Sequence, residues 1–437
     1  MLKRPVKFYL HTLGCPKNVV DAEEMASRLL DAGDVPVARP EDADVVVLNT
    51  CGFIAPARAE SLETARALAQ MKRAGQRLVV AGCLAEREPD AVRGVDGVDV
   101  VLGTKRHAEI GAACHDGVPE RPSPRSLDLS NGWRRVAGGV SAYLKVADGC
   151  DHVCTFCTIP SFKGPLRSKP PALLIAEAEL LVASGTKELV LIAQDTTDYG
   201  HDLRDGTTLA TLLRALDARF ADRGVWIRVM YGYPHHVNDA LLDTMARCRS
   251  VVPYLDMPLQ HAHRDTLRRM KRGGSAEWHL ALVERIRARV PDVILRSTFI
   301  LGFPGESEGE FATLLAFLEA ARIEHAGFFP YSRERGTPAG EAVDQVDEDT
   351  KLERLARAQR LQQRIGMAAN RRAVGRSLDV LIERHERRWA IGRSVREAPE
   401  VDGEVHVRSA APLPPIGSFA RATVTGAGAT WLRASAP

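Results

Sequence analysis

Residues 142–157 of the chain read Ala-Tyr-Leu-Lys-Val-Ala-Asp-Gly-Cys-Asp-His-Val-Cys-Thr-Phe-Cys. The first six of these residues predict a strand, and the loop directly after it carries Cys150, Cys154 and Cys157. Three thiolates in one short loop can ligate three irons of a 4Fe–4S cluster and leave the fourth iron open to a small molecule. Structural zinc is the alternative. A closed zinc site needs a fourth ligand, however, and His152 is the one local candidate, at an awkward spacing.

Strands and helices alternate from this loop to about residue 366. Six apolar stretches have the length of buried strands: Ala142–Ala147, Glu188–Ala193, Val225–Met230, Val252–Met257, Val293–Ile300 and Ala326–Phe329. Helical stretches lie between them, for example at 171–184 and 276–289. This alternation favours a parallel α/β sheet, and six units predict an open, partial (β/α)6 barrel. Such folds place their chemistry at the C-terminal ends of the strands, where the cysteine loop begins.

Two further strand ends in this region carry residues that could bind a cofactor. Gln194 and Asp195 follow the second strand, and a glycine-rich turn with Gly302, Gly305 and Glu306 follows the fifth. The glycines could let adenine or ribose approach the backbone closely. An ordinary strand-to-helix turn, with Glu306 in the first helical turn, explains the turn residues almost as well.

The N-terminal part of the chain predicts a separate parallel α/β sheet. Strands are expected at 7–11, 44–49 and 77–81 and helices at 18–30 and 56–73, with Asp21, Glu23 and Glu24 near the positive N-terminal end of the first helix. Each strand is followed by a cysteine with a neighbouring glycine: Cys15, Cys51 and Cys83. Because parallel strands end at one edge of a sheet, the three thiols can converge there and hold a second cluster. Three buried structural cysteines are the alternative interpretation.

The end of the chain has a third pattern. A linker rich in Pro, Ser, Gly and Arg is expected at 118–139, and a charged helix at 349–370. Short strand-like pieces with turns follow, which fits a small antiparallel β-barrel. In residues 371–437, eleven arginines stand against seven aspartates plus glutamates. This excess does not decide between RNA and a basic protein as the partner.

The composition excludes several classes of protein. Among the 437 residues, 59 are Lys or Arg and 56 are Asp or Glu. This difference is too small to indicate nucleic-acid binding by charge alone. No apolar run approaches the roughly 20 residues that span a bilayer, and the first residues lack a signal-peptide pattern, so we expect a cytoplasmic protein without membrane contact. The eight cysteines should then stay reduced, which favours metal ligands, catalytic groups or core residues over disulfides.

Taken together, the motifs resemble those of the radical S-adenosylmethionine methylthiotransferases. They occur in order along nearly the whole chain: Gly14-Cys15-Pro16-Lys17-Asn18, Asn49-Thr50-Cys51-Gly52-Phe53-Ile54, Gly82-Cys83-Leu84, the Gly149–Cys157 loop, Leu301-Gly302-Phe303-Pro304-Gly305-Glu306, and Tyr331-Ser332 with Gly336-Thr337-Pro338. The resemblance implies an N-terminal cluster domain at 5–120, a radical core at 136–366 and a TRAM-like barrel at 369–437. The last segment departs from the family pattern, because it lacks the usual acidic ending.

Two motifs distinguish branches of this family. Pro16-Lys17-Asn18 with the following Asp21, and Gln194-Asp195-Thr196, are similar to the branch that modifies an aspartate of a small-subunit ribosomal protein. The alternative is the branch that modifies an adenosine of tRNA, which usually shows other residues at both places.

The resemblance also implies cofactors and partners. Two 4Fe–4S clusters are implied, one on Cys15, Cys51 and Cys83, the other on the catalytic Cys150, Cys154 and Cys157. S-adenosylmethionine would be both methyl donor and radical source, the first cluster would carry the sulfur, and the radical would take hydrogen from the aspartate Cβ. The implied partners are the ribosomal protein, free or ribosome-assembled, an electron donor such as flavodoxin or ferredoxin, and a sulfur source.

Overall fold

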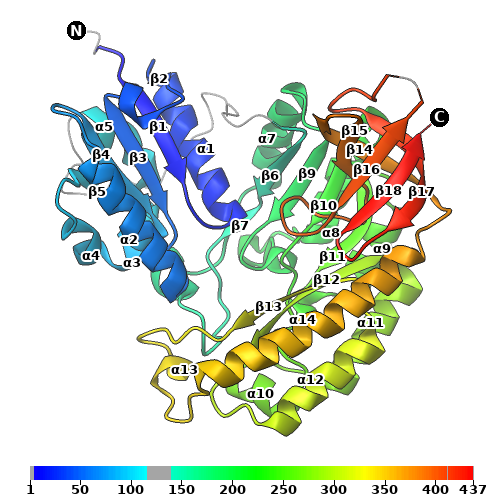
Figure 1. Ribbon diagram of the computed structural model, residues 1–437. Coiled ribbons are helices and arrows are strands. Elements are labelled where there is room, and N and C mark those ends of the chain that lie inside the picture. Colours follow the sequence, from blue (N-terminus) through cyan, green and yellow to red (C-terminus); the bar gives the residue numbers. More distant parts are fainter. Residues whose placement is uncertain (1–3, 116–138, 411, 437) are drawn as a thin grey trace.

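Figure 1 shows the computed structural model of the chain, which describes residues 4–115, 139–410 and 412–436. An N-terminal α/β sheet, a central α/β sheet and a small β-barrel follow one another along the sequence. The linker expected at 118–139 lies outside the described residues, apart from Gly139. Among the described helices, none combines the length and the apolar character that crossing a membrane demands.

The N-terminal sheet is parallel, with the strand order β2-β1-β3-β4-β5. Its elements are β1 (Lys7–Thr12), α1 (Pro16–Asp31), β2 (Val35–Pro36), β3 (Val45–Thr50), α2 (Ala55–Gln70), β4 (Arg77–Gly82), α3 (Cys83–Arg87), α4 (Pro89–Arg93), β5 (Val100–Gly103), the 3-10 helix η2 (Thr104–Glu109) and α5 (Ile110–His115). The valine-rich β3 is buried along its whole length, as expected for a central parallel strand with helices on both faces. The strand order reverses between β1 and β3, and ligands bind at such reversals, beyond the carboxyl ends of the strands.

The central sheet has six parallel strands in the order β13-β12-β11-β10-β9-β6. Its strands are β6 (Ser141–Lys145), β9 (Glu188–Ile192), β10 (Trp226–Val229), β11 (Val251–Asp256), β12 (Ile294–Leu301) and β13 (His325–Pro330). The main helices are α7 (Pro171–Ala183), α8 (Leu209–Phe220), α9 (Asp239–Arg247), α11 (Ala276–Arg289), α12 (Glu308–Ala321) and α14 (Glu348–Arg371). This architecture confirms the predicted open, six-stranded partial barrel. The first expected strand divides, because Ala147–Asp148 forms β7 and pairs antiparallel with β8 (Arg167–Ser168).

Both neighbouring domains help to cover the concave face of the central sheet. This face presents an apolar cluster that includes Tyr143, Ile192 and Tyr254. Val20 of α1 packs into the same cluster from the N-terminal domain, and Ala398 packs into it from the C-terminal domain. Segments far apart in the sequence therefore pack against the same face of the central sheet.

The C-terminal domain is a closed barrel with the strand order β14-β15-β16-β18-β17. Its strands are β14 (Ser377–Glu386), β15 (Trp389–Arg393), β16 (Glu404–Ser409), β17 (Phe419–Ala427) and β18 (Trp431–Ala436). The predicted small barrel is confirmed, with one amendment: β16 and β18 pair in parallel. A closed ring with an odd number of strands cannot alternate in direction throughout, so one parallel pair is unavoidable.

Candidate active site

The contiguous cysteine triad, Cys150, Cys154 and Cys157, lies on the loop between β7 and the short helix α6 (Ile159–Lys163). The loop starts at Gly149, which has a positive φ of 79° and leaves no room for a side chain: an added Cβ would lie 2.0 Å from the Pro165 carbonyl oxygen. Inside the loop, the Thr155 hydroxyl donates to the Arg269 carbonyl at 2.8 Å. Backbone contacts thus hold the three thiols at the C-terminal end of the sheet.

Hydrogen-bond donors surround the sulfur atoms of this triad. The backbone N–H of Ile159 donates to Cys157 Sγ at 3.4 Å, and Arg272 Nη1 donates to Cys154 Sγ at 3.7 Å. Burial raises the pKa of Cys150 to about 11 and that of Cys157 to about 12, so both thiols hold their protons in the metal-free chain. Iron binding must therefore displace protons. Donors to sulfur are among the contacts that set the potential of an iron–sulfur cluster.

Asp195 supports the cysteine loop through His152. His152 Nε2 lies 2.7 Å from one Asp195 oxygen, and His236 Nδ1 lies 2.9 Å from the same atom. The His152 ring also stacks on Tyr233, with 4.0 Å between the ring centroids. Burial alone would raise the pKa of Asp195, but the hydrogen bonds from the two histidines hold it well below its ordinary value. In this geometry Asp195 positions the loop, and its expected contact with a cofactor stays a prediction.

Gln194, the other expected residue at this strand end, has a free acceptor. Its amide nitrogen donates to Asp148 Oδ1 at 3.1 Å. Its carbonyl oxygen is buried and has no hydrogen-bond partner among the described residues. Because buried polar atoms are rarely left unpaired, this oxygen is suited to accept a hydrogen bond from a ligand.

The turn with Gly302, Gly305 and Glu306 has a structural explanation of its own. Gly302 and Gly305 both have positive φ, of 67° and 73°, and an added Cβ would lie 2.2 Å from Lys351 Cγ and 2.3 Å from Asp344 Oδ2, respectively. The crowding that requires glycine here thus comes from α14 and the segment before it.

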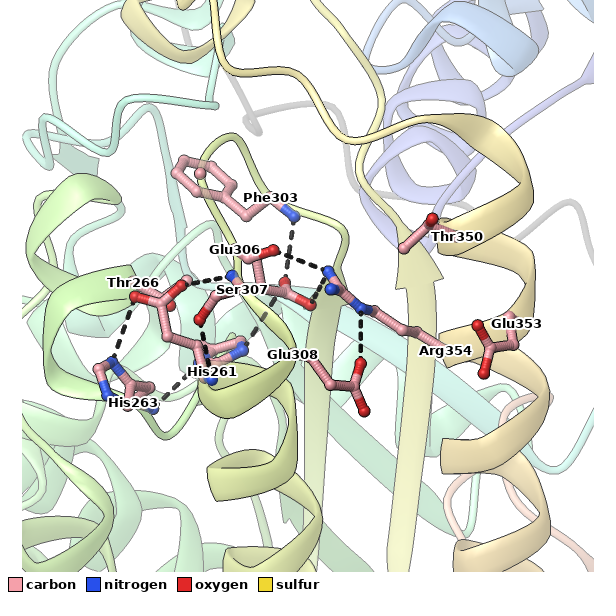
Figure 2. A network of polar contacts seen from close by, with 12 residues as sticks. His261, His263, Thr266, Phe303, Glu306, Ser307, Glu308, Thr350, Glu353 and Arg354 are labelled. Carbon is pink, nitrogen blue, oxygen red and sulfur yellow. Dashed lines mark hydrogen bonds and ion pairs between the residues drawn. The ribbon is translucent and has the colours of Figure 1, made fainter.

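Figure 2 shows Glu306 within a polar network that joins this turn to α14. The carboxylate accepts from the Phe303 N–H at 3.1 Å and from Arg354 Nη1 at 2.9 Å. Burial raises the pKa of Glu306, which the Phe303 N–H and Arg354 oppose. Next to it, Ser307 and Glu310 form the capping box that starts α12. These contacts organise the turn, and direct contact of its residues with a cofactor stays a prediction.

The dispersed triad, Cys15, Cys51 and Cys83, is brought together by three interlocking loops at the ends of β1, β3 and β4. Glycines make the approach possible. A Cβ on Gly14 would lie 2.7 Å from Cys51 Cβ, and one on Gly52 would lie 2.8 Å from the Cys83 carbonyl carbon. These distances confirm the sequence argument that the three cysteines converge at one sheet edge.

Asn18 ties the same three loops together. Its side-chain nitrogen donates to the carbonyls of Leu13 and Thr50, both at 2.9 Å. Its side-chain oxygen accepts from Cys83 Sγ at 3.4 Å. The sequence shows Asn18 within a cysteine motif, but its partners lie on other strands and could not be read from the motif.

Charges from both domains act on the dispersed triad. Burial raises the pKa of Cys83 to about 12, and the nearby Lys163 ammonium opposes that effect. Burial likewise raises the pKa of Cys51, and Lys17 opposes it. Lys163 belongs to α6, the helix that follows the contiguous triad. The surroundings of the two triads therefore meet.

A second contact between the domains holds the Cys51 and Cys83 loops. Arg87 donates to the Gly52 carbonyl at 2.8 Å and to Glu334 Oε2 at 3.0 Å. Glu334 lies after β13, is 2% exposed, and also accepts from the Ala55 N–H at 2.8 Å. The sequence motifs do not indicate Arg87, Glu334, Tyr233 or Arg272, because the roles of these residues arise from contacts distant in sequence.

Comparison with protein-family models divides the chain in the same way. Residues 7–103 match the Uncharacterized protein family UPF0004, residues 144–318 match the Radical SAM superfamily, and residues 374–436 match the TRAM domain.

Curated relatives match over almost their whole length. "Ribosomal protein uS12 methylthiotransferase RimO" of Chloroflexus aurantiacus is 47% identical over 430 residues, which cover 92% of this chain and 94% of that protein. The protein of the same description from Herpetosiphon aurantiacus is 42% identical, with 96% of this chain and 97% of that protein covered.

Solved structures share the fold at low sequence identity. The radical S-adenosylmethionine methyltransferase TsrM from Kitasatospora setae matches with a TM-score of 0.58 and 16% identity, over 76% of this chain and 75% of that one. The cobalamin-dependent S-adenosylmethionine radical enzyme OxsB matches with a TM-score of 0.54 and 12% identity, over 82% of this chain and 56% of that one.

Proposed function

Because this chain belongs to the RimO family of radical S-adenosylmethionine methylthiotransferases, we propose that it attaches a methylthio group to the Cβ of an aspartate in ribosomal protein uS12. The observation that carries the proposal is the extent of the relationship. Relatives described as uS12 methylthiotransferases are 41–47% identical over 92–97% of the chain. The motifs of both cysteine triads also fall within the residues that the two family models match, 7–103 and 144–318.

The radical S-adenosylmethionine family implies that cofactor and one 4Fe–4S cluster, and the N-terminal domain suggests a second cluster. We assign the first cluster to Cys150, Cys154 and Cys157, and the second to Cys15, Cys51 and Cys83. When bound, these groups supply a low-potential electron, a 5′-deoxyadenosyl radical and the sulfur and methyl groups to be transferred.

The chain's own residues prepare the radical site. The bond from His152 to Asp195 fixes the cysteine loop, and Arg272 brings a positive charge beside Cys154 that offsets the charge of the thiolates. In the proposal, the unpaired Gln194 carbonyl oxygen accepts a hydrogen bond from S-adenosylmethionine. Asp195, Gly302, Gly305 and Glu306 complete the cofactor site, partly by shaping its walls.

The interlocked loops prepare the sulfur-bearing site. Cys15, Cys51 and Cys83 would hold the cluster that supplies the sulfur to be transferred. A radical on carbon would be lost if it diffused, so the two sites must face one water-poor space. We further propose that the chain acts in the cytoplasm on a ribosomal protein, free or assembled, with a flavodoxin- or ferredoxin-like electron donor and a sulfur source.

The test is anaerobic reconstitution with iron and sulfide, followed by incubation with S-adenosylmethionine, a reductant, and either purified uS12 or bulk tRNA. Mass spectrometry would seek the mass of a methylthio group in place of hydrogen. Gain of that mass on an aspartate of uS12 supports the proposal. Gain on a tRNA adenosine instead would move the chain to the alternative branch. If 5′-deoxyadenosine forms but neither uS12 nor tRNA gains a methylthio group, both the proposal and its alternative are wrong.

A further inference from the structure

A buried carboxylate links the two segments of the chain that carry Cys15 and the contiguous triad. Asp21 of α1 is 2% exposed, and its two oxygens face two ammonium groups of the central domain. Lys163 Nζ lies 2.9 Å from Asp21 Oδ2, and Lys145 Nζ pairs with Asp21 Oδ1. The expectation that Asp21 lies near the positive N-terminal end of α1 is wrong, because the first turn of that helix carries no acidic residue. Asp21 instead pairs with two lysines of the central domain.

The positions of these residues in the chain are informative. Asp21 lies on α1, six residues after Cys15, the N-cap residue of that helix. Lys145 ends β6, five residues before Cys150, and Lys163 ends α6, six residues after Cys157. Both ends of the contiguous cysteine loop are thus anchored to one carboxylate, which is rigidly connected to a ligand of the other triad.

Further buried contacts complete the anchor. Lys163 Nζ also donates to Thr104 Oγ1 of the N-terminal domain at 2.8 Å and lies 3.4 Å from Asp148 Oδ2. Lys169 Nζ lies 2.9 Å from Glu177 and 3.2 Å from Glu24 of α1. Burial alone would raise the pKa of Asp21, but the lysines hold it far below its ordinary value, so the carboxylate stays charged.

Such pairs contribute more to geometry than to stability. Desolvation offsets most of the attraction within a buried ion pair, whereas a fixed partner specifies one arrangement of the elements. Apolar packing across this boundary is limited: in the described residues, the two main N-terminal apolar clusters contain residues of that domain alone, and Val19 and Val20 of α1 reach the central cluster. Polar boundaries between domains ordinarily permit relative motion.

We infer that Asp21 is a positioning residue, which together with Lys145 and Lys163 sets the register of the two cysteine triads for transfer between them. The inference rests on the proposed function, since it supposes that both triads serve one reaction. It predicts that breaking the ion pairs of Asp21 reduces methylthio transfer but leaves radical formation unchanged, because cofactor cleavage needs the contiguous triad alone.

Lys163→Met and Asp21→Asn test this prediction, alone and combined. The expected result is that 5′-deoxyadenosine continues to form while methylthiolated uS12 per 5′-deoxyadenosine falls about 100-fold, the scale of loss that a 1 Å misplacement can cause. Since the two residues act through one contact, the double variant should lose no more than the worse single variant. If Lys163→Met does not fold, Asp21→Asn carries the test, because it preserves the side-chain shape.

Two readouts do not depend on turnover. Hydrogen exchange on the full-length, cluster-free chain should rise in α1 and in the 150–163 segment of both variants. In the reconstituted protein, the magnetic interaction between the two reduced clusters should broaden or shift in the electron paramagnetic resonance spectrum. The matched control is Arg228→Met. It removes another buried ion pair, in which Arg228 Nε lies 2.7 Å from Glu188 Oε1.

The outcomes separate the two proposals. If Lys163→Met and Asp21→Asn both form as much methylthiolated uS12 per 5′-deoxyadenosine as the unaltered protein, with unchanged hydrogen exchange and spectra, the inference is overturned. The proposed function would remain intact. An equal loss of coupling in Arg228→Met would also overturn it, because general destabilisation would then suffice. Failure of the unaltered protein to methylthiolate uS12 would instead contradict the proposed function.

Discussion

The two cysteine triads reach similar arrangements by different means. Cys150, Cys154 and Cys157 lie on one loop, whose shape is set by nearby backbone contacts and by one glycine. Cys15, Cys51 and Cys83 lie at three strand ends, and their approach depends on three loops packing at backbone distance. The contiguous triad needs a correct loop, whereas the dispersed triad needs a correct sheet. Substitutions in the contiguous triad and in the dispersed triad should therefore have different effects on cofactor cleavage, methylthio transfer and iron content. The following substitutions test that difference.

The largest effect is expected from Cys154→Ala. It removes one of the three thiolates of the contiguous triad and so should abolish S-adenosylmethionine cleavage and every later step. The measurement is 5′-deoxyadenosine after anaerobic reconstitution, with iron content as a second readout. About half of the iron should remain, because the dispersed triad is unchanged. Continued formation of 5′-deoxyadenosine would rule out the assignment of this triad.

Cys51→Ala should produce a narrower loss. Cofactor cleavage should continue, because the contiguous triad is intact, while transfer of the methylthio group should stop. The measurement compares 5′-deoxyadenosine with methylthiolated uS12 in one reaction. Cys248→Ala is the matched control, since this partly buried cysteine is the C-cap residue of α9 and belongs to neither triad. Methylthiolated product from Cys51→Ala would contradict a role for the dispersed triad in sulfur delivery.

The same contrast explains what could be predicted from the sequence. The sheets and the cysteine loop follow from local signals, namely apolar runs of strand length and ligand spacing within a few residues. The convergence of Cys15, Cys51 and Cys83 was also predictable, because parallel topology places strand ends on one edge. β18 has no strong signal of its own, since its short alternating segment is recognisable as a strand only once the barrel must close.

Predictions failed or stayed open where partners are distant in sequence. Asp21 was placed by the dipole of its own helix, but its lysine partners are 124 and 142 residues away. The turn at Gly302 and Gly305 was recognised, yet the crowding that requires glycine comes from Lys351 and Asp344. The local sequence pattern thus identifies where the chain turns, whereas tertiary contacts determine which residue type each turn requires.

Gly82→Ala tests the dependence of the dispersed triad on close packing. Gly82 has φ of 100°, and an added Cβ would lie 2.4 Å from Asn49 Oδ1 and 2.7 Å from the Thr50 carbonyl. Gly33→Ala is the control, because Gly33 has φ of 90° with nothing within 4 Å. The control should cost about 1–2 kcal/mol for the left-handed backbone alone. Gly82→Ala should add about 1–3 kcal/mol of overpacking.

The iron content makes this comparison specific. Gly82→Ala should lose iron from the dispersed triad while 5′-deoxyadenosine formation continues, and Gly33→Ala should retain both clusters. Thermal unfolding measures the stability difference, and iron analysis measures occupancy. Equal unfolding temperatures and equal iron in the two variants would show that the loops yield to a methyl group, and that the dispersed triad is less dependent on packing than its geometry indicates.

The smallest effect concerns pH and the central domain. His261 is fully buried beside Glu306 (Figure 2), and burial lowers its pKa from 6.5 to about 3. Between pH 6.5 and about pH 3, His261 binds a proton in the unfolded chain but stays uncharged in the folded chain. The free energy of unfolding therefore decreases as the pH falls below 6.5. The loss approaches about 1.4 kcal/mol per pH unit for this group.

His261→Asn should flatten this dependence, because an amide can replace the acceptor that His261 Nδ1 offers to the His263 N–H at 3.0 Å but cannot titrate. The measurement is the unfolding temperature of the central domain between pH 7.5 and 5, with His201→Asn as the control at a side chain that is 80% exposed. The variant has a lower unfolding temperature at pH 7.5, since asparagine leaves a small cavity, and its difference from the unaltered protein narrows as the pH falls. Parallel curves would mean that His261 is not held uncharged, and that acid sensitivity of the central domain arises elsewhere.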